Sequence, residues 1–147
     1  MPVQDYQGGY AVDQTIGYAG MRADNTVCDV ASRSVENAAV AFGLAVGAGT
    51  ADGSCRLDGT GFEGITVADK SREADDTDAD QYAVGEMAGV MRKGTIWVTA
   101  STNVDPTDPV TFTAATGVIG AGLATTIAGA KFETTATSGN LVRVYLP

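Results

Sequence analysis

The segment NLVRVYL (140–146) alternates apolar and polar residues along its length. In an extended chain, one side would carry Val142, Val144 and Leu146, and the other Arg143 and Tyr145. A repeat of two is typical of a β-strand with one buried face and one solvated face. We therefore expect a strand here, and a fold built from strands of this kind.

Further strand-like segments follow one another along the chain, with turn residues between them. We expect strands at 34–47, 61–68, 82–91, 94–100, 108–114 and 130–137. Arg92 and Lys93 separate two of these segments and predict a hairpin turn. The succession of strands and turns predicts an all-β fold, an antiparallel β-sandwich or barrel with an extended N-terminal arm.

The first 33 residues differ from the rest because neither strand-like nor helix-like periodicity persists in them. Tyrosines are dispersed there among glycines and polar residues. We expect residues 1–33 to form an extended arm whose aromatic side chains bind a neighbouring molecule. Candidate interface residues are Tyr6, Tyr10, Tyr18 and Met21.

Residues 34–147 are expected to form a single β domain, in which a weak repeat suggests two related halves, 40–69 and 110–138. One ungapped alignment pairs all four Phe residues of the chain, Phe42 with Phe112 and Phe62 with Phe132. A duplicated unit predicts that Phe62 and Phe132 occupy equivalent core positions, with Glu63 and Glu133 facing outward. Coincidence is the alternative, because matches of Gly and Ala are common in this composition.

The composition excludes several classes of function. The 147-residue chain has a net charge of −9, so it lacks the basic surface that binding to nucleic acid or anionic lipid requires. It contains no His, which rules out Ser-His-Asp and Cys-His catalytic sites. No apolar run reaches the roughly 18 residues of a membrane span, and the N-terminus does not resemble a secretory signal. We therefore expect synthesis in a cytoplasm and no membrane partner.

Two other features are candidates for chemistry, and neither matches a known site. Cys28 and Cys55 form no CxxC motif and are interpreted as two partly buried thiols, with a disulfide as the alternative. The acidic stretch 69–80 begins like a calcium loop, with Asp76, Asp78 and Asp80 in alternation. Gln81 and Met87 then stand where such a loop needs Gly and Glu, so a solvated acidic loop is favoured, and weak divalent binding stays open. The sequence thus predicts no enzyme, no cofactor and no metal site.

The order of several segments resembles a known family. They are GYAGMRADN, ENAAVAFGLAVGAG, FEGITVAD, QYAVGEMAGVMRKGTIWV, DPVTFTAATG and AGAKFETTATSGNLVRVYL. Over about residues 16–146, this succession resembles the structural cement (head decoration) proteins of tailed bacteriophages. Glu86 departs from the family pattern, which has Asp after Gly85, and residues 105–109 replace the usual Gly-Asp-Pro-Val turn.

The resemblance implies a structural virion protein on the outer surface of the phage capsid. Such a protein would bind the major capsid protein, bridge neighbouring subunits and stabilise the head against DNA pressure. It would be a homo-oligomer, a trimer or a dimer, with no nucleic acid or membrane partner. Many weak contacts repeated over the shell would give high avidity.

An alternative of another class is a carbohydrate-binding β-sandwich, an adhesin on the virion surface. Its structural sign would be an exposed Trp97 with nearby Tyr side chains in a groove. A small hydrolase is disfavoured, because the chain has no His and no nucleophile motif.

Overall fold

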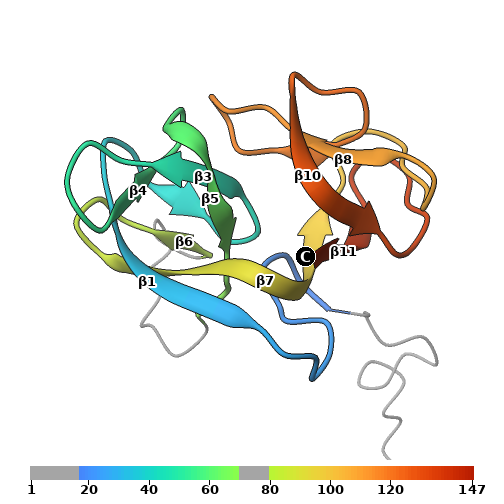
Figure 1. The fold of residues 1–147 in the computed structure, drawn as a ribbon, viewed down its shortest axis with the longest axis horizontal. Helices are drawn as coiled ribbons and strands as arrows, with labels where there is room; N and C mark the ends of the chain where they lie inside the picture. Colours follow the sequence, from blue (N-terminus) through green and yellow to red (C-terminus); the bar gives the residue numbers. More distant parts are fainter. Residues whose placement is uncertain (1–16, 70–79) are drawn as a thin grey trace, which may run out of the picture.

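The computed structural model describes residues 17–69 and 80–147 (Figure 1). Within them all regular elements are strands, which confirms the predicted all-β class. The strands are β1 (Asp29–Val35), β2 (Val40–Ala41), β3 (Ala45–Ala48), β4 (Ser54–Arg56), β5 (Thr60–Thr66), β6 (Gln81–Tyr82), β7 (Met87–Thr99), β8 (Pro109–Phe112), β9 (Ile119–Gly120), β10 (Thr125–Phe132) and β11 (Leu141–Leu146).

Nine of these strands form one continuous sheet that curls into two small units, side by side in Figure 1. In the first unit the order β1-β4-β3-β5-β7 closes on itself, because β1 also pairs with β7. In the second, β7-β11-β10-β8-β9 is closed by a single bridge between Ala100 and Ile119. We call these the first and second barrels. The short strands β2 and β6 pair separately.

Strand β7 belongs to both barrels, which corrects the hairpin predicted at Arg92 and Lys93. The chain does not turn there but continues as one strand of 13 residues. Opposite β1, Asp29 faces Lys93 and Val30 faces Met91, so Arg92 is the extra residue of a β-bulge. The two exposed charged residues before Gly94, which has φ 127°, do mark an irregularity in the strand. That irregularity is a bulge and not a turn.

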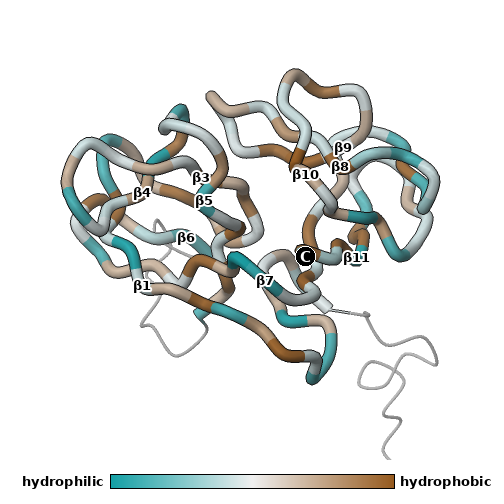
Figure 2. The backbone as a smooth tube through the Cα atoms, viewed as in Figure 1, coloured by the Kyte–Doolittle hydropathy of each residue, from teal (hydrophilic) through white to brown (hydrophobic). Residues whose placement is uncertain are grey.

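The bulge changes which face of β7 is buried. Ala88 and Val90 pack in the smaller core cluster, whereas Met91, Ile96 and Val98 pack in the larger one. The larger cluster fills the second barrel with side chains such as Phe112 and Phe132, and Figure 2 shows hydrophobic residues concentrated along the strands. Strand β11 keeps the predicted alternation, with every second residue from Val142 to Leu146 fully buried.

The strand predicted over residues 34–47 is wrong as one element. In the structure this stretch holds the end of β1, all of β2 and the start of β3. Asn37 and Gly43 adopt left-handed backbone conformations at φ 71° and 76°, which an extended strand does not contain. The chain therefore bends twice where the apolar pattern looks continuous.

The predicted equivalence of Phe62 and Phe132 is also wrong. Phe62 is the third residue of β5 and only half-buried, whereas Phe132 is the last residue of β10 and 1% exposed. The same alignment pairs Val40 with Val110. In the structure, Val40 lies in the separate two-stranded sheet and Val110 lies in the large sheet. The Phe residues that the alignment pairs therefore do not occupy corresponding positions on corresponding strands. The division into two halves stays a prediction.

Glu36 holds the turn between β3 and β4 through an unusual number of contacts. Its carboxylate accepts hydrogen bonds from the backbone N–H groups of Thr50 and Ala51, at 2.9 and 2.8 Å, and from the Ser54 hydroxyl at 2.7 Å. The N–H of Thr50, then that of Ala51 and the Ser54 hydroxyl, lower the pKa of Glu36 from 4.5 to about 2.

This contact set predicts a pH-dependent contribution to stability. Because the folded-state pKa is depressed, the contribution of Glu36 is fully present above about pH 4.5 and is lost as the pH falls toward 2. We expect Glu36→Gln to lower the free energy of unfolding at pH 7, with the difference from wild type shrinking in acid. Urea titrations from pH 7 to pH 2.5 measure this difference, with Asp52→Asn in the same turn as control. A difference that is constant across this range would contradict the assignment.

Candidate functional site

The four predicted interface residues are only partly within the described structure. Tyr6 and Tyr10 lie outside the described residues. Tyr18 is 42% exposed, and Met21 is half-buried. Residues 17–24 do not extend freely from the domain, because they pack along β7 before the chain enters β1.

The packing of this segment on β7 is regular. The Gly20 N–H donates to the Trp97 carbonyl at 2.8 Å, the Trp97 N–H donates to the Met21 carbonyl at 2.9 Å, and the Ala23 N–H donates to the Thr95 carbonyl at 2.9 Å. The segment thus forms a short antiparallel extension of the sheet, with a bridge between Arg22 and Ile96.

This extension helps to bury the Trp97 side chain. A Cβ added at Gly17 would lie 3.4 Å from the Trp97 ring and 2.5 Å from the end of the Met21 side chain. Trp97 is 8% exposed, as expected for a core residue. The structural sign of a sugar-stacking platform, an exposed Trp97 in a groove, is therefore not seen.

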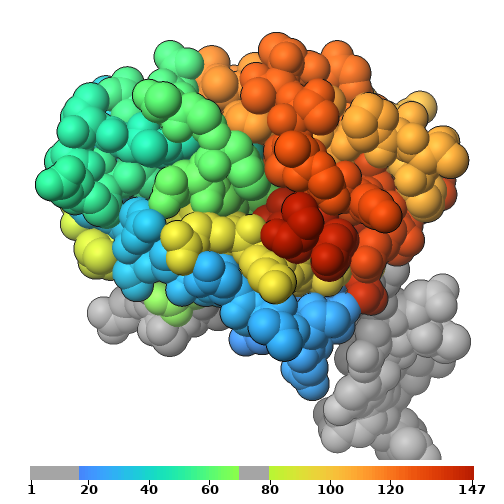
Figure 3. All heavy atoms as spheres, in the orientation of Figure 1, coloured from blue at the N-terminus to red at the C-terminus, as the bar shows by residue number. Residues whose placement is uncertain are grey.

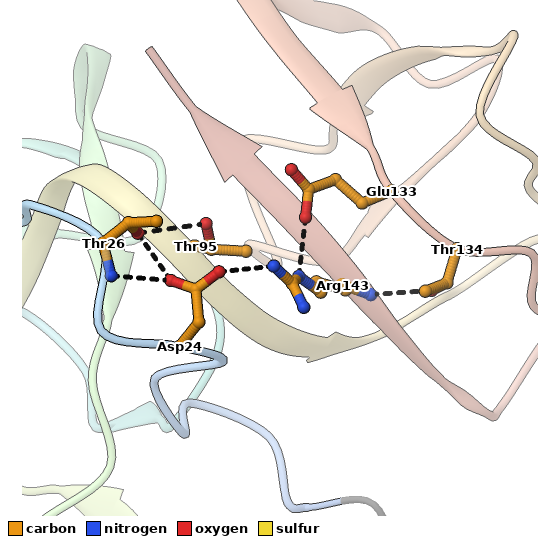
Figure 4. A network of polar contacts seen from close by, with 6 residues as sticks. All are labelled: Asp24, Thr26, Thr95, Glu133, Thr134 and Arg143. Atoms are coloured by element: carbon orange, nitrogen blue, oxygen red, sulfur yellow. Dashed lines mark hydrogen bonds and ion pairs between the residues drawn. The ribbon is translucent and has the colours of Figure 1, made fainter.

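A polar network fixes the same segment to β11 (Figure 4). The Arg143 guanidinium donates to the Asp24 carboxylate, and Arg143 Nε lies 2.6 Å from Glu133 Oε2 in an ion pair without aligned hydrogen-bond geometry. The Thr26 hydroxyl and backbone N–H also donate hydrogen bonds to the Asp24 carboxylate. These hydrogen bonds, with a further contribution from Arg143, hold the pKa of Asp24 below its usual value. Arg143 therefore adds a side-chain link between the N-terminal segment and the second barrel to the backbone hydrogen bonds with β7.

A cleft of about 380 Å³ lies between the two barrels. Its lining comes from β5, β7, β10 and the end of the chain, namely Phe62, Arg92, Thr126, Ile127, Ala128, Leu146 and Pro147. Figure 3 shows the surface where β5 (green), β7 (yellow), β10 (orange) and the C-terminal residues (dark red) meet. No sequence pattern pointed to this cleft, because its walls come from strands far apart in the chain.

Strands β1 and β7 each carry one exposed large apolar side chain, Val30 and Met87. Gly89 alternates with the buried Ala88 and Val90, and a Cβ at Gly89 would lie 3.4 Å from Val30 and 3.8 Å from Val67. Val30 is 42% exposed and Met87, two residues from Gly89 on the same strand, is 60% exposed.

The described residues offer little for catalysis. They contain no group of three or more Cys, Asp or Glu side chains that could hold a metal ion. Cys28 and Cys55 are both free thiols, and burial, with a further contribution from Glu63, raises the pKa of Cys55 to about 11. A buried thiol with a raised pKa is largely protonated at neutral pH. The acidic residues Asp76 and Asp78 lie outside the described residues.

The part of the chain that the structure describes contains no helix long and apolar enough to cross a membrane. The fold defines a small all-β protein in which two barrels share strand β7.

Comparison with known proteins gives the family. Residues 6–146 match the family described as structural cement protein (E217 gp24/Pam3 gp6), so the chain belongs to this family. Its role is accordingly a structural one in the phage capsid. No curated protein matches the chain.

Two solved structures share the fold. One is from the capsid of Myoviridae phage XM1, with a TM-score of 0.70 and 18% identity, covering 95% of each chain. The other is the N base of head fiber gp8.5 in bacteriophage phi29, with a TM-score of 0.50 and 14% identity, covering 82% of this chain and 95% of that one. At these identities the likeness concerns the fold alone.

Proposed function

We propose that this protein binds the outer surface of the phage capsid and cements neighbouring major capsid proteins against the pressure of the packaged DNA. The family match over residues 6–146 carries the proposal. Two barrels that share one long strand form a stiff body, and a stiff bridge resists the separation of the subunits that it joins. The net charge of −9 suits a basic or mixed capsid exterior and disfavours contact with DNA.

Within this proposal, Tyr6, Tyr10, Tyr18 and Met21 belong to the contacts with neighbouring subunits. Tyr18 is the member for which the structure gives the clearest support, because it is exposed next to a firmly held segment. We also propose that the protein is made in the host cytoplasm and acts on the virion as a homo-oligomer, a dimer or a trimer. It would act without a cofactor, a nucleic-acid partner or a membrane partner.

Co-sedimentation with expanded, DNA-free capsids tests the attachment. We expect the purified full chain to bind at a fixed, saturable ratio to the major capsid protein, and Tyr18→Ala to weaken binding. Thr125→Ala, at an exposed position on β10, is the matched control and should bind like wild type. Binding that never saturates, or that is absent, would contradict the proposal.

A further inference from the structure

The cleft between the barrels has the size and the walls of a binding groove. Its volume of about 380 Å³ falls within the range in which proteins hold ligands or side chains of a partner. Phe62 from the first barrel and Ile127 and Leu146 from the second supply apolar walls, whereas Ala128 is exposed at the edge. An inserted aromatic side chain would find apolar contacts on two sides.

One basic residue lines this groove, and two more lie near its lining residues in sequence or across the sheet, although the chain as a whole is strongly acidic. Arg92 lines it and pairs with Asp29 at 2.8 Å. Lys93 is exposed beside Gly94, which faces Leu146 across the sheet. Lys131 is exposed and faces Tyr145, the neighbour of Leu146. The groove therefore favours an acidic occupant that also carries apolar or aromatic side chains.

The chain itself contains a segment with this chemistry. Residues 1–16 include Asp5 and Asp13 and no Lys or Arg, and they carry two tyrosines, Tyr6 and Tyr10. Tyr combines a large apolar body with a polar tip, which suits a groove that is apolar inside and polar at the edge. We propose that the groove of one copy binds residues 1–16 of a neighbouring copy.

The course of the described chain favours a neighbouring copy over the same molecule. Going backward along the sequence, Ala23 lies beside Thr95 and Gly20 beside Trp97, so the chain leads toward the C-terminal end of β7. The groove lies at the other end of this part of β7, next to Arg92 and Gly94. Sixteen extended residues span up to about 50 Å, which is enough to reach an adjacent molecule without reversing direction.

Such an exchange would link the copies into an oligomer by means of their own segments. A single segment bound in a single groove gives a weak contact. When the copies form a closed ring or a reciprocal pair, every segment is bound at once, and the combined affinity is higher. This self-association does not rest on attachment to the capsid, and it is tested without capsids.

The test uses a fluorescein-labelled synthetic peptide of residues 1–16 and the full-length protein. Ala128→Glu places a negative charge at the exposed edge of the groove, and Ala124→Glu, exposed and outside the groove lining, is the matched control. We expect saturable binding in fluorescence anisotropy, about tenfold weaker for Ala128→Glu and unchanged for Ala124→Glu. A peptide with Asp5→Lys and Asp13→Lys should bind more weakly than the native peptide.

Light scattering after size exclusion provides the second measurement. Full-length protein should form oligomers whose fraction rises with concentration, and Ala128→Glu should shift them toward monomer while circular dichroism stays unchanged. Equal peptide affinity for the Ala128→Glu and wild-type proteins would overturn the groove. A wild-type protein that stays monomeric at all concentrations would overturn the exchange between copies and indicate docking within one molecule.

Discussion

Replacing Trp97 by Ala lowers the free energy of unfolding by about 3–5 kcal/mol, the cost usual for removing a buried Trp. The side chain is 8% exposed, on the mid-part of β7, and Gly17 and Met21 lie over it. Its loss leaves a cavity beneath the N-terminal segment and removes the apolar surface on which that segment packs. Because Trp97 is the chain's single Trp, urea unfolding is followed by circular dichroism and not by fluorescence.

Hydrogen exchange separates local loosening from global loss of stability in this variant. The amides of Gly20 and Ala23 donate hydrogen bonds to β7 carbonyls. When the Trp97 side chain beneath this segment is removed, these amides should exchange faster than the amides of β11. Trp97→Phe keeps much of the apolar volume and should cost markedly less. A loss below about 1 kcal/mol for Trp97→Ala would show that the segment over residues 17–24 contributes little packing.

Gly20→Ala is expected to destabilise the protein by about 3 kcal/mol, because it combines backbone strain with a steric clash. Gly20 has φ 85°, and an added Cβ would lie 2.7 Å from the Ala68 nitrogen and 2.9 Å from the Phe42 Cβ. The Gly20 carbonyl also accepts a hydrogen bond from the Ala68 N–H, at 2.8 Å. This glycine therefore joins the N-terminal segment to the first barrel while its N–H is held by Trp97.

The matched control is Gly53→Ala. Gly53 has a similar φ of 70°, but an added Cβ there would meet no atom within 4 Å. It should show the cost of backbone strain alone, about 1 kcal/mol. Chemical denaturation of both variants compares the two costs directly. Equal destabilisation by the two substitutions would mean that the close approach of Gly20 to residues 42 and 68 has no energetic weight.

Strand content was predictable where alternation was clear and local. Residues 140–146 became β11 with the expected faces, because a period of two with Val and Leu on one side has few other structural solutions. The shared strand β7 was missed because Arg92 and Lys93 have the same sequence signal in a bulge as in a turn. Only the pairing of Asp29 with Lys93 distinguishes them, and that contact is distant in sequence.

The candidate site was less predictable than the fold. Tyrosine content marked residues 1–33 as unusual, but it could not reveal that residues 20–23 pair with β7 and that Asp29–Val35 form β1. Arg143 was recognised only as an outward-facing strand residue, and its link to Asp24 spans most of the chain. The cleft depends on how two barrels meet, so no local pattern contains it.

Thermal rupture of expanded capsids tests the central claim, that this protein cements the shell. Capsids lacking the protein are heated with and without a saturating amount of the purified full chain, and release of an encapsulated dye reports opening. The account predicts a higher rupture temperature with the protein present, and a rise that follows occupancy until the sites are filled. The same rupture temperature at full occupancy as with no protein bound would contradict the account.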